Sequence, residues 1–448
     1  MPIYDIGRIG VKRSRESLTR IFPKDYSGRI GDFCPAFPGT ELVAWPGVGS
    51  LFPSTTAAAT GVVMLKLSNP IVRWTLILTL TTYLGLFVEK ARAQSEPYRT
   101  VKSAIVDSKQ VGAARRELRR VLAGGGALSA DDRKTLQNFY VRCIFAPMTQ
   151  PSAQQSPEDY PKWRATVVKD LESIRNRPEV HRFIRDELVG KYLRQLATKN
   201  YHPACRYNAT LMLGVLNDVE ARVNNRVYPL PHAETRAFLI KLMDPRNKQP
   251  EVVQLAALIS LNRHAGLLRA DGQTDNKMIP PLVKIIQAPL PENSLEHDTH
   301  YWKKKLAIDT LGDIGLSGAA TTIGGVVSSQ EAPLWVRCAA AESIGKLDYS
   351  SAQNLNSDEL VKGLGQVALA ACLEEIERVK KYDAENPQEE NRVNLGGFAE
   401  NNKVEANPAV TEARRTLKHY LACVSKGLSG LESSSAGQSS TLLATVKT

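Results

Sequence analysis

Apolar residues recur at helical spacing along most of the chain beyond about residue 100. In the stretch SADDRKTLQNFYVRCIF, Leu136, Phe139 and Cys143 lie three or four positions apart, as on one face of a helix. Ser129 stands where an N-cap is expected, and Asp132 follows it by three positions. No stretch alternates between apolar and polar residues with the period of two that a strand requires. The pattern predicts an all-α fold.

Four segments of the chain resemble one another. They are ACRYNATLMLG (204–214), VVQLAALISLN (252–262), WKKKLAIDTLG (302–312) and WVRCAAAESIG (335–345). Aligned on their closing residues Gly214, Asn262, Gly312 and Gly345, they share a small residue at Ala209, Ala257, Ala307 and Ala340. Repeats spaced by about 30 to 50 residues are typical of stacked helix pairs.

Each of these segments follows a second amphipathic stretch. The preceding stretches are residues 183–197, 234–243, 279–287 and 319–327. Each unit is therefore predicted to be a helix, a turn and a second helix. The second helix needs small residues because it lies between its own partner and the next unit, and one unit alone cannot bury both faces.

The stretch LWVRCAAAESIGKL is similar to the second helix of a HEAT repeat. Arg206 and Arg337 match the arginine position of that family, whereas Gln254 and Lys304 depart from it, and Asn262 replaces the closing glycine. The similarity covers a little over a third of the chain. It implies a right-handed α-solenoid of stacked HEAT-like helical hairpins, whose surface binds a protein or peptide partner.

The pattern divides the chain into six parts. They are a disordered extension or start-site artefact (1–63), a signal peptide or signal anchor (64–93), an N-terminal helical cap or degenerate repeats (94–176), HEAT-like repeats (177–348), a C-terminal helical pair with an acidic insert (349–428) and a disordered tail (429–448). Residues 1–63 are rich in Gly, Pro and Ser, and we favour translation from Met64 over a true extension.

Residues 64–93 have the three parts of a secretory signal. Lys66 and Arg73 supply positive charge, an uncharged and mostly apolar run follows, and Ala91 and Ala93 form a small-x-small cleavage pattern. We expect cleavage and export to the periplasm or cell envelope. The alternative is an inner-membrane anchor formed by residues 71–88, which would contact the membrane if the segment is not cleaved.

Composition changes this picture little. The formal net charge is +12, but part of the excess lies in residues 1–93, so the remainder is only mildly basic. Five of the six cysteines, Cys143, Cys205, Cys338, Cys372 and Cys423, follow residue 93, and none forms a C-x-x-C pair. We expect buried free thiols, although an oxidising compartment fits them less well.

Candidate chemistry is sparse. His297 and His300 have a spacing that could place two metal ligands on one helical face, with carboxylates beside them, but we expect a loop that enters a helix. No nucleophile or metalloprotease motif is present, and we expect no catalytic residue and no cofactor. Arg115, Arg116, Arg119 and Arg120 share one broad helical face, which is either solvated or a docking surface for an acidic partner or anionic lipid headgroups.

We therefore expect a non-catalytic scaffold or adaptor of the cell envelope that binds a protein or peptide. One alternative is an enzyme or an enzyme-assisting protein similar to the lyase-like relatives that carry HEAT-type repeats; it requires a pocket with clustered His, Cys or Asp. A second alternative is a cytoplasmic nucleic-acid-binding protein, which applies if the leader is spurious. The modest net charge argues against nucleic acid as a partner.

Overall fold

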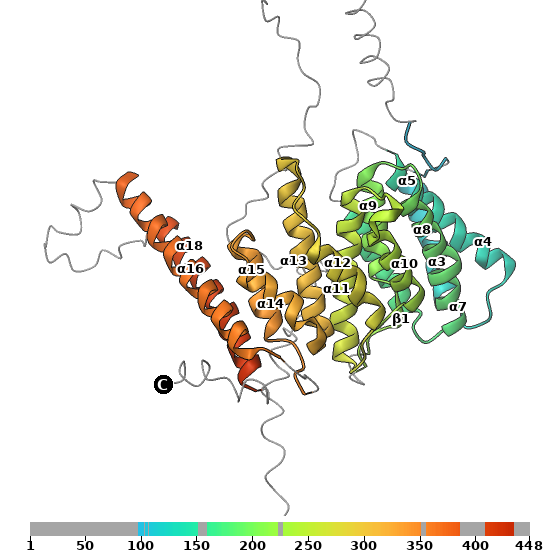
Figure 1. Cartoon of the computed structure of the whole chain (residues 1–448). Helices are drawn as coiled ribbons and strands as arrows, with labels where there is room; N and C mark the ends of the chain where they lie inside the picture. The colour runs from blue at the N-terminus through green and yellow to red at the C-terminus, as the bar shows by residue number, and fades with distance from the viewer. Residues whose placement is uncertain are drawn as a thin grey trace, which may run out of the picture. The chain divides into compact units, whose positions relative to one another are not determined.

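The computed structural model describes most of the chain beyond residue 96 (Figure 1). The described residues are 97–102, 104–105, 107–150, 159–222, 227–350, 355–385 and 408–433. The chain divides between Gln94 and Ser95, and all described residues belong to the second part. The predictions for residues 1–63, the leader 64–93, the anchor 71–88 and most of the tail lie outside the described residues.

The first helices form a small bundle. They are α3 (Ser108–Ala123), α4 (Ala130–Phe139), the π-helix η2 (Tyr140–Phe145), α5 (Ala146–Thr149) and α6 (Asp159–Ser173). The predicted capping box of α4 is confirmed, because Ser129 accepts a hydrogen bond from the Asp132 backbone and the Asp132 side chain accepts one from Ser129. Leu118 and Leu136 are fully buried between α3 and α4.

The remaining helices follow in pairs. They are α7 (Pro178–Arg182), the π-helix η3 (Phe183–Gly190) and α8 (Lys191–Thr198) in one continuous run, then α9 (Pro203–Gly214), α10 (Ala233–Met243), α11 (Glu251–Ala270), α12 (Ile279–Gln287), α13 (His297–Ile314), α14 (Ala320–Ser328), α15 (Leu334–Ile344), α16 (Ser357–Glu385) and α18 (Pro408–Glu432). Short 3₁₀ turns are η5 (Pro245–Asn247), η6 (Asn276–Met278), η7 (Ser294–Glu296) and η8 (Ser317–Ala319).

The four segments that resemble one another are the helices α9, α11, α13 and α15, which we call the second helices. Each packs against the helix before it, namely α8, α10, α12 or α14, and against the neighbouring second helix. Helix α15 packs against α18, and α16 lies beside α14, α15 and α18. Figure 1 shows these helices in chain order from green to red. The described part of the chain is mostly helical, which confirms the all-α fold class.

A short β-ladder was not predicted. In the connection between α9 and α10, β1 (Asn217–Val219) pairs antiparallel with β2 (Leu230–Pro231). The all-α prediction did not include this ladder. Two or three residues are too few to show an alternating pattern, and the pairing depends on how the connection folds back.

The shared alanines lie where the second helices meet. Ala209, Ala257, Ala307 and Ala340 are all fully buried. A side chain of this size lets the backbones of neighbouring helices approach closely. The closing glycines act in the same way: a Cβ atom at Gly312 would lie 2.7 Å from the Ser343 hydroxyl, and one at Gly214 would clash with Ser260. Ser343 and Ser260 each stand two positions before the closing residue of the next second helix.

The arginines of the repeats also have a repeated contact. Arg206 donates from Nε to the Ala197 carbonyl at the end of α8, and Arg337 donates from Nε to the Val327 carbonyl near the end of α14. Carbonyl groups in the last turn of a helix have no partner within that helix. Each arginine therefore caps the first helix of its own pair. Gln254, at the equivalent position of α11, donates to the Gln249 carbonyl instead.

Within the described residues, none of the helices combines the length and the apolar composition that a membrane crossing requires.

Candidate functional site

The second helices share one partly exposed side, which we call the second-helix face. It consists of Tyr207 and Leu211 on α9, Leu255 and Ile259 on α11, Trp302, Lys305 and Asp309 on α13, and Trp335 and Glu342 on α15. These residues stand ten, seven or three positions before the closing residue of each segment, so they lie on the same side of every helix. The half formed by α9 and α11 is apolar, and the half formed by α13 and α15 also carries charge.

Two tryptophans join neighbouring helices on this face. Trp302 and Trp335 occupy equivalent positions, and their ring centroids lie 5.2 Å apart. Trp302 is 42% exposed, and Ile259 on the adjacent helix is also exposed. Large apolar side chains that remain exposed in a row, rather than singly, are a common feature of protein interaction sites.

The charged half of the face is held by ion pairs. Lys305 lies 2.6 Å from Asp309 on α13, and beside the face Lys346 lies 3.0 Å from Asp313 across the junction of α13 and α15. Burial raises the pKa of Asp309, and the nearby Lys305 ammonium opposes the rise. These charges give the face polarity without a free excess of either sign.

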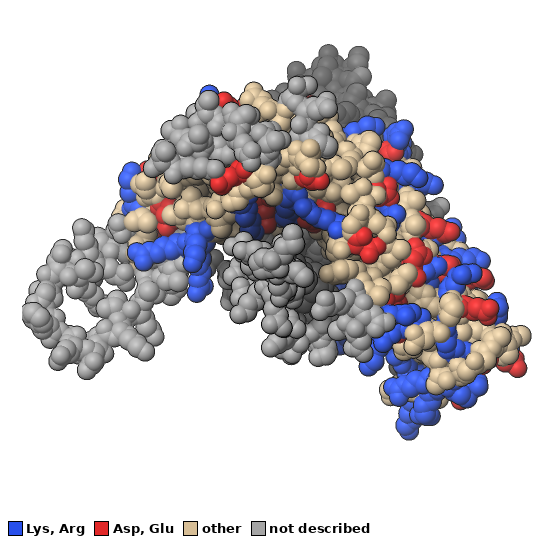
Figure 2. Space-filling model, turned by 90° about the horizontal axis from the view of Figure 1, so that it is seen from below, with Lys and Arg blue, Asp and Glu red and all other residues tan. Residues whose placement is uncertain are grey.

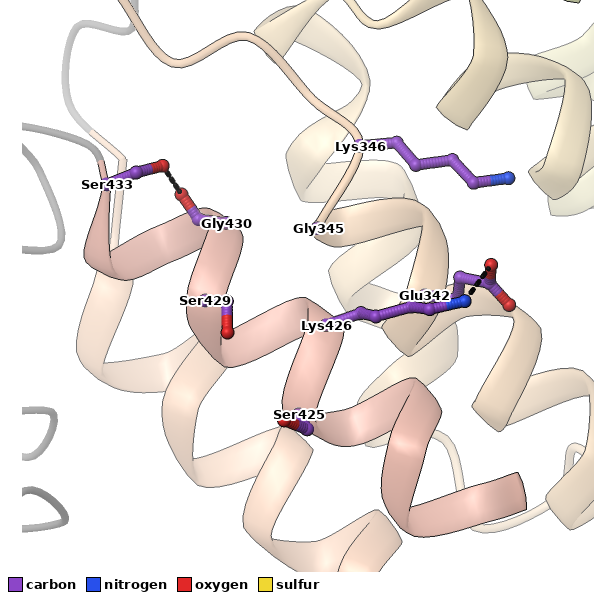
Figure 3. A pocket seen from close by; sticks show the side chains of 8 residues that line it. All are labelled: Glu342, Gly345, Lys346, Ser425, Lys426, Ser429, Gly430 and Ser433. Atoms are coloured by element: carbon purple, nitrogen blue, oxygen red, sulfur yellow. Dashed lines mark hydrogen bonds and ion pairs between the residues drawn. The ribbon is translucent and has the colours of Figure 1, made fainter. Parts of the chain in front are cut away.

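A hollow of about 420 Å³ lies between α15 and α18, and Figure 3 shows it from close by. Glu342, Lys346, Lys426 and three serines, Ser425, Ser429 and Ser433, line most of it. In Figure 3 the Lys426 side chain crosses to Glu342, which it meets at 2.9 Å, while Lys346 points away from α18. Both lysines are therefore already paired, and the described residues that line the hollow offer no free cation.

Cys423 lies beside this hollow and is the thiol closest to a catalytic arrangement. Its Sγ atom is 3.7 Å from a Glu342 oxygen and 3.9 Å from His419 Nε2. Burial raises the pKa of the Cys423 thiol to about 11, and the Glu342 charge contributes to the rise. A protonated thiol is a poor nucleophile and a poor metal ligand. In this geometry Cys423 is therefore a packing residue.

The cysteines as a group match the sequence expectation. Cys143, Cys205, Cys338 and Cys423 are buried free thiols, and Cys372 is free and partly exposed. Burial raises the pKa of Cys205 and of Cys338 to about 12. Among the five cysteines that the structure describes, no disulfide is formed.

The arginine face of α3 divides into two parts. Arg115 is turned inward: it lies 2.9 Å from the buried carboxylate of Asp170 and over the ring of Phe139. Arg120 pairs with Glu117 on its own helix at 3.1 Å and approaches Asp132 on α4. Half of the predicted arginines therefore have internal partners.

Arg116 and Arg119 are the other two arginines. Both are exposed, and neither has an ion pair within the part of the chain that the structure describes. They are the members of the arginine face that remain available to a partner.

The two candidate metal ligands lie in the first turn of α13, not in a loop before it. His297 Nε2 donates to the Pro291 carbonyl at 2.9 Å. His300 is buried beside Tyr301, and burial together with Lys304 and Lys303 lowers its pKa to about 4. Over the described ranges, no three His, Cys, Asp or Glu side chains converge as a metal site would need.

A second apolar surface, which sequence reasoning missed, runs along α16. Leu369, Leu373, Ile376 and Val379 are between 39% and 60% exposed. Their spacing of three or four residues is the pattern of a buried helix face, so the sequence alone contains no sign that this side is open.

Comparison of the chain with protein-family models, with curated proteins and with solved structures finds no match.

Proposed function

We propose that the chain is a right-handed α-solenoid of HEAT-like helical hairpins that acts as a non-catalytic scaffold or adaptor. The pairing of α8 with α9, α10 with α11, α12 with α13 and α14 with α15 supports this architecture. So do the two arginine caps and the two contacts between a closing glycine and a serine, because each recurs at an equivalent position. In a repeat array the stacked units form one long surface, which suits binding more than chemistry.

The second-helix face is the binding surface in this proposal. The observation that carries it is the exposed Trp302, which is in contact with Trp335 and continues the apolar row of Leu255 and Ile259. The partner is a peptide segment whose apolar side chains contact the face from α9 to α13. Its charged side chains contact the paired charges of α13 and α15. Aromatic residues of this kind supply much of the binding energy of protein interfaces.

Site-specific photo-crosslinking in the native cell tests this proposal. A photoreactive amino acid placed at Trp302 should give one discrete adduct, and the same group at Lys284, which is exposed on the first helix α12, should give none. Trp302→Ala should then weaken capture of the crosslinked partner by about tenfold or more, as expected for a central aromatic residue. Equal adducts at both positions, or unchanged capture, would contradict the proposal.

Export to the cell envelope remains part of the proposal and rests on residues 64–93. The N-terminus of the mature protein should then be Gln94. Sequencing the N-terminus of the purified protein decides this point. An intact segment 64–93 in protein purified without membranes would rule cleavage out.

A further inference from the structure

A cleft of about 290 Å³ opens beside α7 and β1, and none of the residues that line it belongs to the second-helix face. Arg175, which follows α6, lines the cleft together with Arg182, Arg185 and Arg222. Two carboxylates, Asp218 and Glu220, and the His181 ring complete its charged lining. The cleft therefore brings together arginines from three segments that are separate in the sequence.

The two carboxylates already have partners. Asp218 lies 2.8 Å from Arg185 and also accepts a hydrogen bond from the Ala233 backbone at 3.0 Å. Glu220 accepts from the Asn217 side chain at 2.8 Å and lies 3.2 Å from His181 Nε2. These bonds hold Asp218 and Glu220 in place at the floor of the cleft and engage their carboxylate oxygens.

The floor is built by unusual backbone. Arg185 lies in the π-helix η3, and the same guanidinium also meets Asp186 at 2.6 Å. Segments of π-helix within α-helices occur frequently at functional sites. Asp218 and the residues after it come from β1 and its extension, so the ladder that the sequence did not predict positions this side of the cleft.

The arginines at the rim of the cleft have fewer hydrogen-bond and ion-pair partners than the carboxylates of its floor. Arg182 and Arg222 are exposed, and among the described residues neither guanidinium has an ion pair or a hydrogen-bonded acceptor. The Arg175 guanidinium donates to the Ala221 carbonyl, at 3.3 Å. Figure 2 shows Lys and Arg side chains gathered at the end of the protein formed by the early helices, on the right of that view.

We propose that this cleft binds the phosphate group of a ligand, with Arg182 and Arg222 as the principal contacts and Arg175 as the third. A guanidinium presents a planar fork of donors that matches the oxygens of a phosphate, and charge-assisted bonds of this kind are about twice as strong as neutral ones. Asp218 holds Arg185 in place, Glu220 is held by Asn217 and His181, and the rim arginines are left to the ligand. This site is independent of the second-helix face.

Binding of inorganic phosphate to the full chain, measured by isothermal titration calorimetry, tests the proposal. Arg182→Gln/Arg222→Gln should weaken binding by about a hundredfold, since each charged hydrogen bond contributes roughly a factor of ten. The matched control is Arg116→Gln/Arg119→Gln, which removes the same charge from exposed arginines outside the cleft. The control should bind phosphate as the parent does.

A third variant adds a gain of affinity. Glu172 lies near Arg175 and Glu220; partial desolvation and the Glu220 charge raise its pKa, and the Arg175 charge opposes the rise. Glu172→Gln removes a negative charge beside the cleft and should strengthen phosphate binding several-fold. No phosphate binding by the parent, or equal losses in the cleft and control variants, would overturn the proposal.

The source of the phosphate is distinguished by a parallel measurement. Phosphatidylcholine vesicles with and without phosphatidic acid are sedimented with the parent and with the cleft variant. Phosphatidic-acid-dependent sedimentation that is lost in the cleft variant supports a lipid headgroup as the source. Phosphate binding without such sedimentation supports a soluble ligand. Sedimentation that persists in the cleft variant contradicts a role of the cleft in lipid binding.

Discussion

The junction of α13 with α15 and the junction of α15 with α18 use the same residue type for different contacts. At the first junction the atoms nearest to a Cβ atom at Gly312 are the Ser343 hydroxyl and Cβ atom, with the Ser343 Cα atom behind them at 3.0 Å. At the second, Gly345 lies against the backbone of α18, and a Cβ atom at Gly430 would lie 2.6 Å from the Gly345 Cα atom. A side chain can turn or shift, whereas a helix backbone cannot move without moving its whole helix.

The difference shows how the series of repeated pairs ends. Helix α18 takes the position beside α15 that another second helix would take, and both helices contribute a glycine to the contact. Gly427, one turn before Gly430, meets the Ala341 carbonyl and Leu364 in the same contact. The last junction is therefore the least tolerant of added volume.

The largest effect is expected at the backbone contact. Gly430→Leu should destabilise the protein by about 3 kcal/mol, because no rotamer of the new side chain avoids the α15 backbone. Urea denaturation followed by circular dichroism measures the change. Gly365→Leu is the matched control: Gly365 lies on α16 with open space around its Cα atom. That substitution should stabilise the helix by about 0.5–1 kcal/mol, since glycine is unfavourable inside a helix. Similar behaviour of the two variants would contradict the close contact.

An intermediate effect is expected where a repeated alanine is enclosed. Ala340 is fully buried in α15, between the two junctions. Ala340→Leu adds three carbon atoms to a packed interface and should cost about 2 kcal/mol. The same substitution at Ala422, which is exposed on α18, should change the free energy of unfolding by less than about 0.5 kcal/mol. An Ala340 variant as stable as the parent would show that the aligned alanines are not at the contact.

Much of the helical framework was predictable because its cause is local. The second helices carry alanine and glycine where the backbones of neighbouring helices approach closely. Each segment shows these residues in its own sequence. The N-cap at Ser129 was predictable for the same reason. The contact partners of the glycines, Ser260 and Ser343, could have been found by the same alignment, since they share one position.

The candidate sites depend on residues that are distant in the chain. Arg115 belongs to an apparent basic face in the sequence, but its partner Asp170 lies 55 positions away on another helix. The cleft depends on β1, whose pairing with β2 is too short to leave a sequence pattern. It also depends on the π-helix η3. The pairing of Trp302 with Trp335 was visible as an aligned position, although exposure of the pair was not. Tertiary contacts of this kind leave no periodic signal.

A smaller effect is expected at the contact with a side chain. Gly312→Ala should cost about 1.5 kcal/mol, because the new methyl group meets the Ser343 side chain, which is buried but can shift. Ser343→Gly removes the hydroxyl and the Cβ atom, which are the two nearest atoms, and leaves the Cα atom. The double variant Gly312→Ala/Ser343→Gly should therefore recover part of the loss, and the coupling measured in a double-mutant cycle should exceed about 0.5 kcal/mol. Purely additive effects would mean that the two positions are not in contact.

The smallest effect is a pH dependence of the free energy of unfolding, which we expect at the junction of α9 and α11 and not at the junction of α13 and α15. His264 on α11 is fully buried, with Nε2 3.0 Å from the Gly214 carbonyl. Burial, followed by the nearby Arg263 charge, lowers the pKa of His264 well below its usual value, and the Gly214 carbonyl only partly opposes this. The neutral ring is thus the folded form, and it donates from Nε2. No histidine occupies the equivalent place at the α13 and α15 junction, where Lys346 pairs with Asp313.

Above the unfolded pKa of about 6.5, neither the folded nor the unfolded chain protonates His264, so it adds no pH dependence. As the pH falls below that value, the unfolded chain takes up a proton that the folded chain excludes, and stability is lost. One such group should cost about 1 kcal/mol between pH 6.5 and 5.5. His264→Gln retains a donor for the Gly214 carbonyl but cannot titrate. The free energy of unfolding of this variant should therefore fall less steeply over that interval than that of the parent, while contributions from other groups cancel in the difference. Parallel curves for the two proteins would mean that His264 is protonated in the folded state and that the junction differs from the one described.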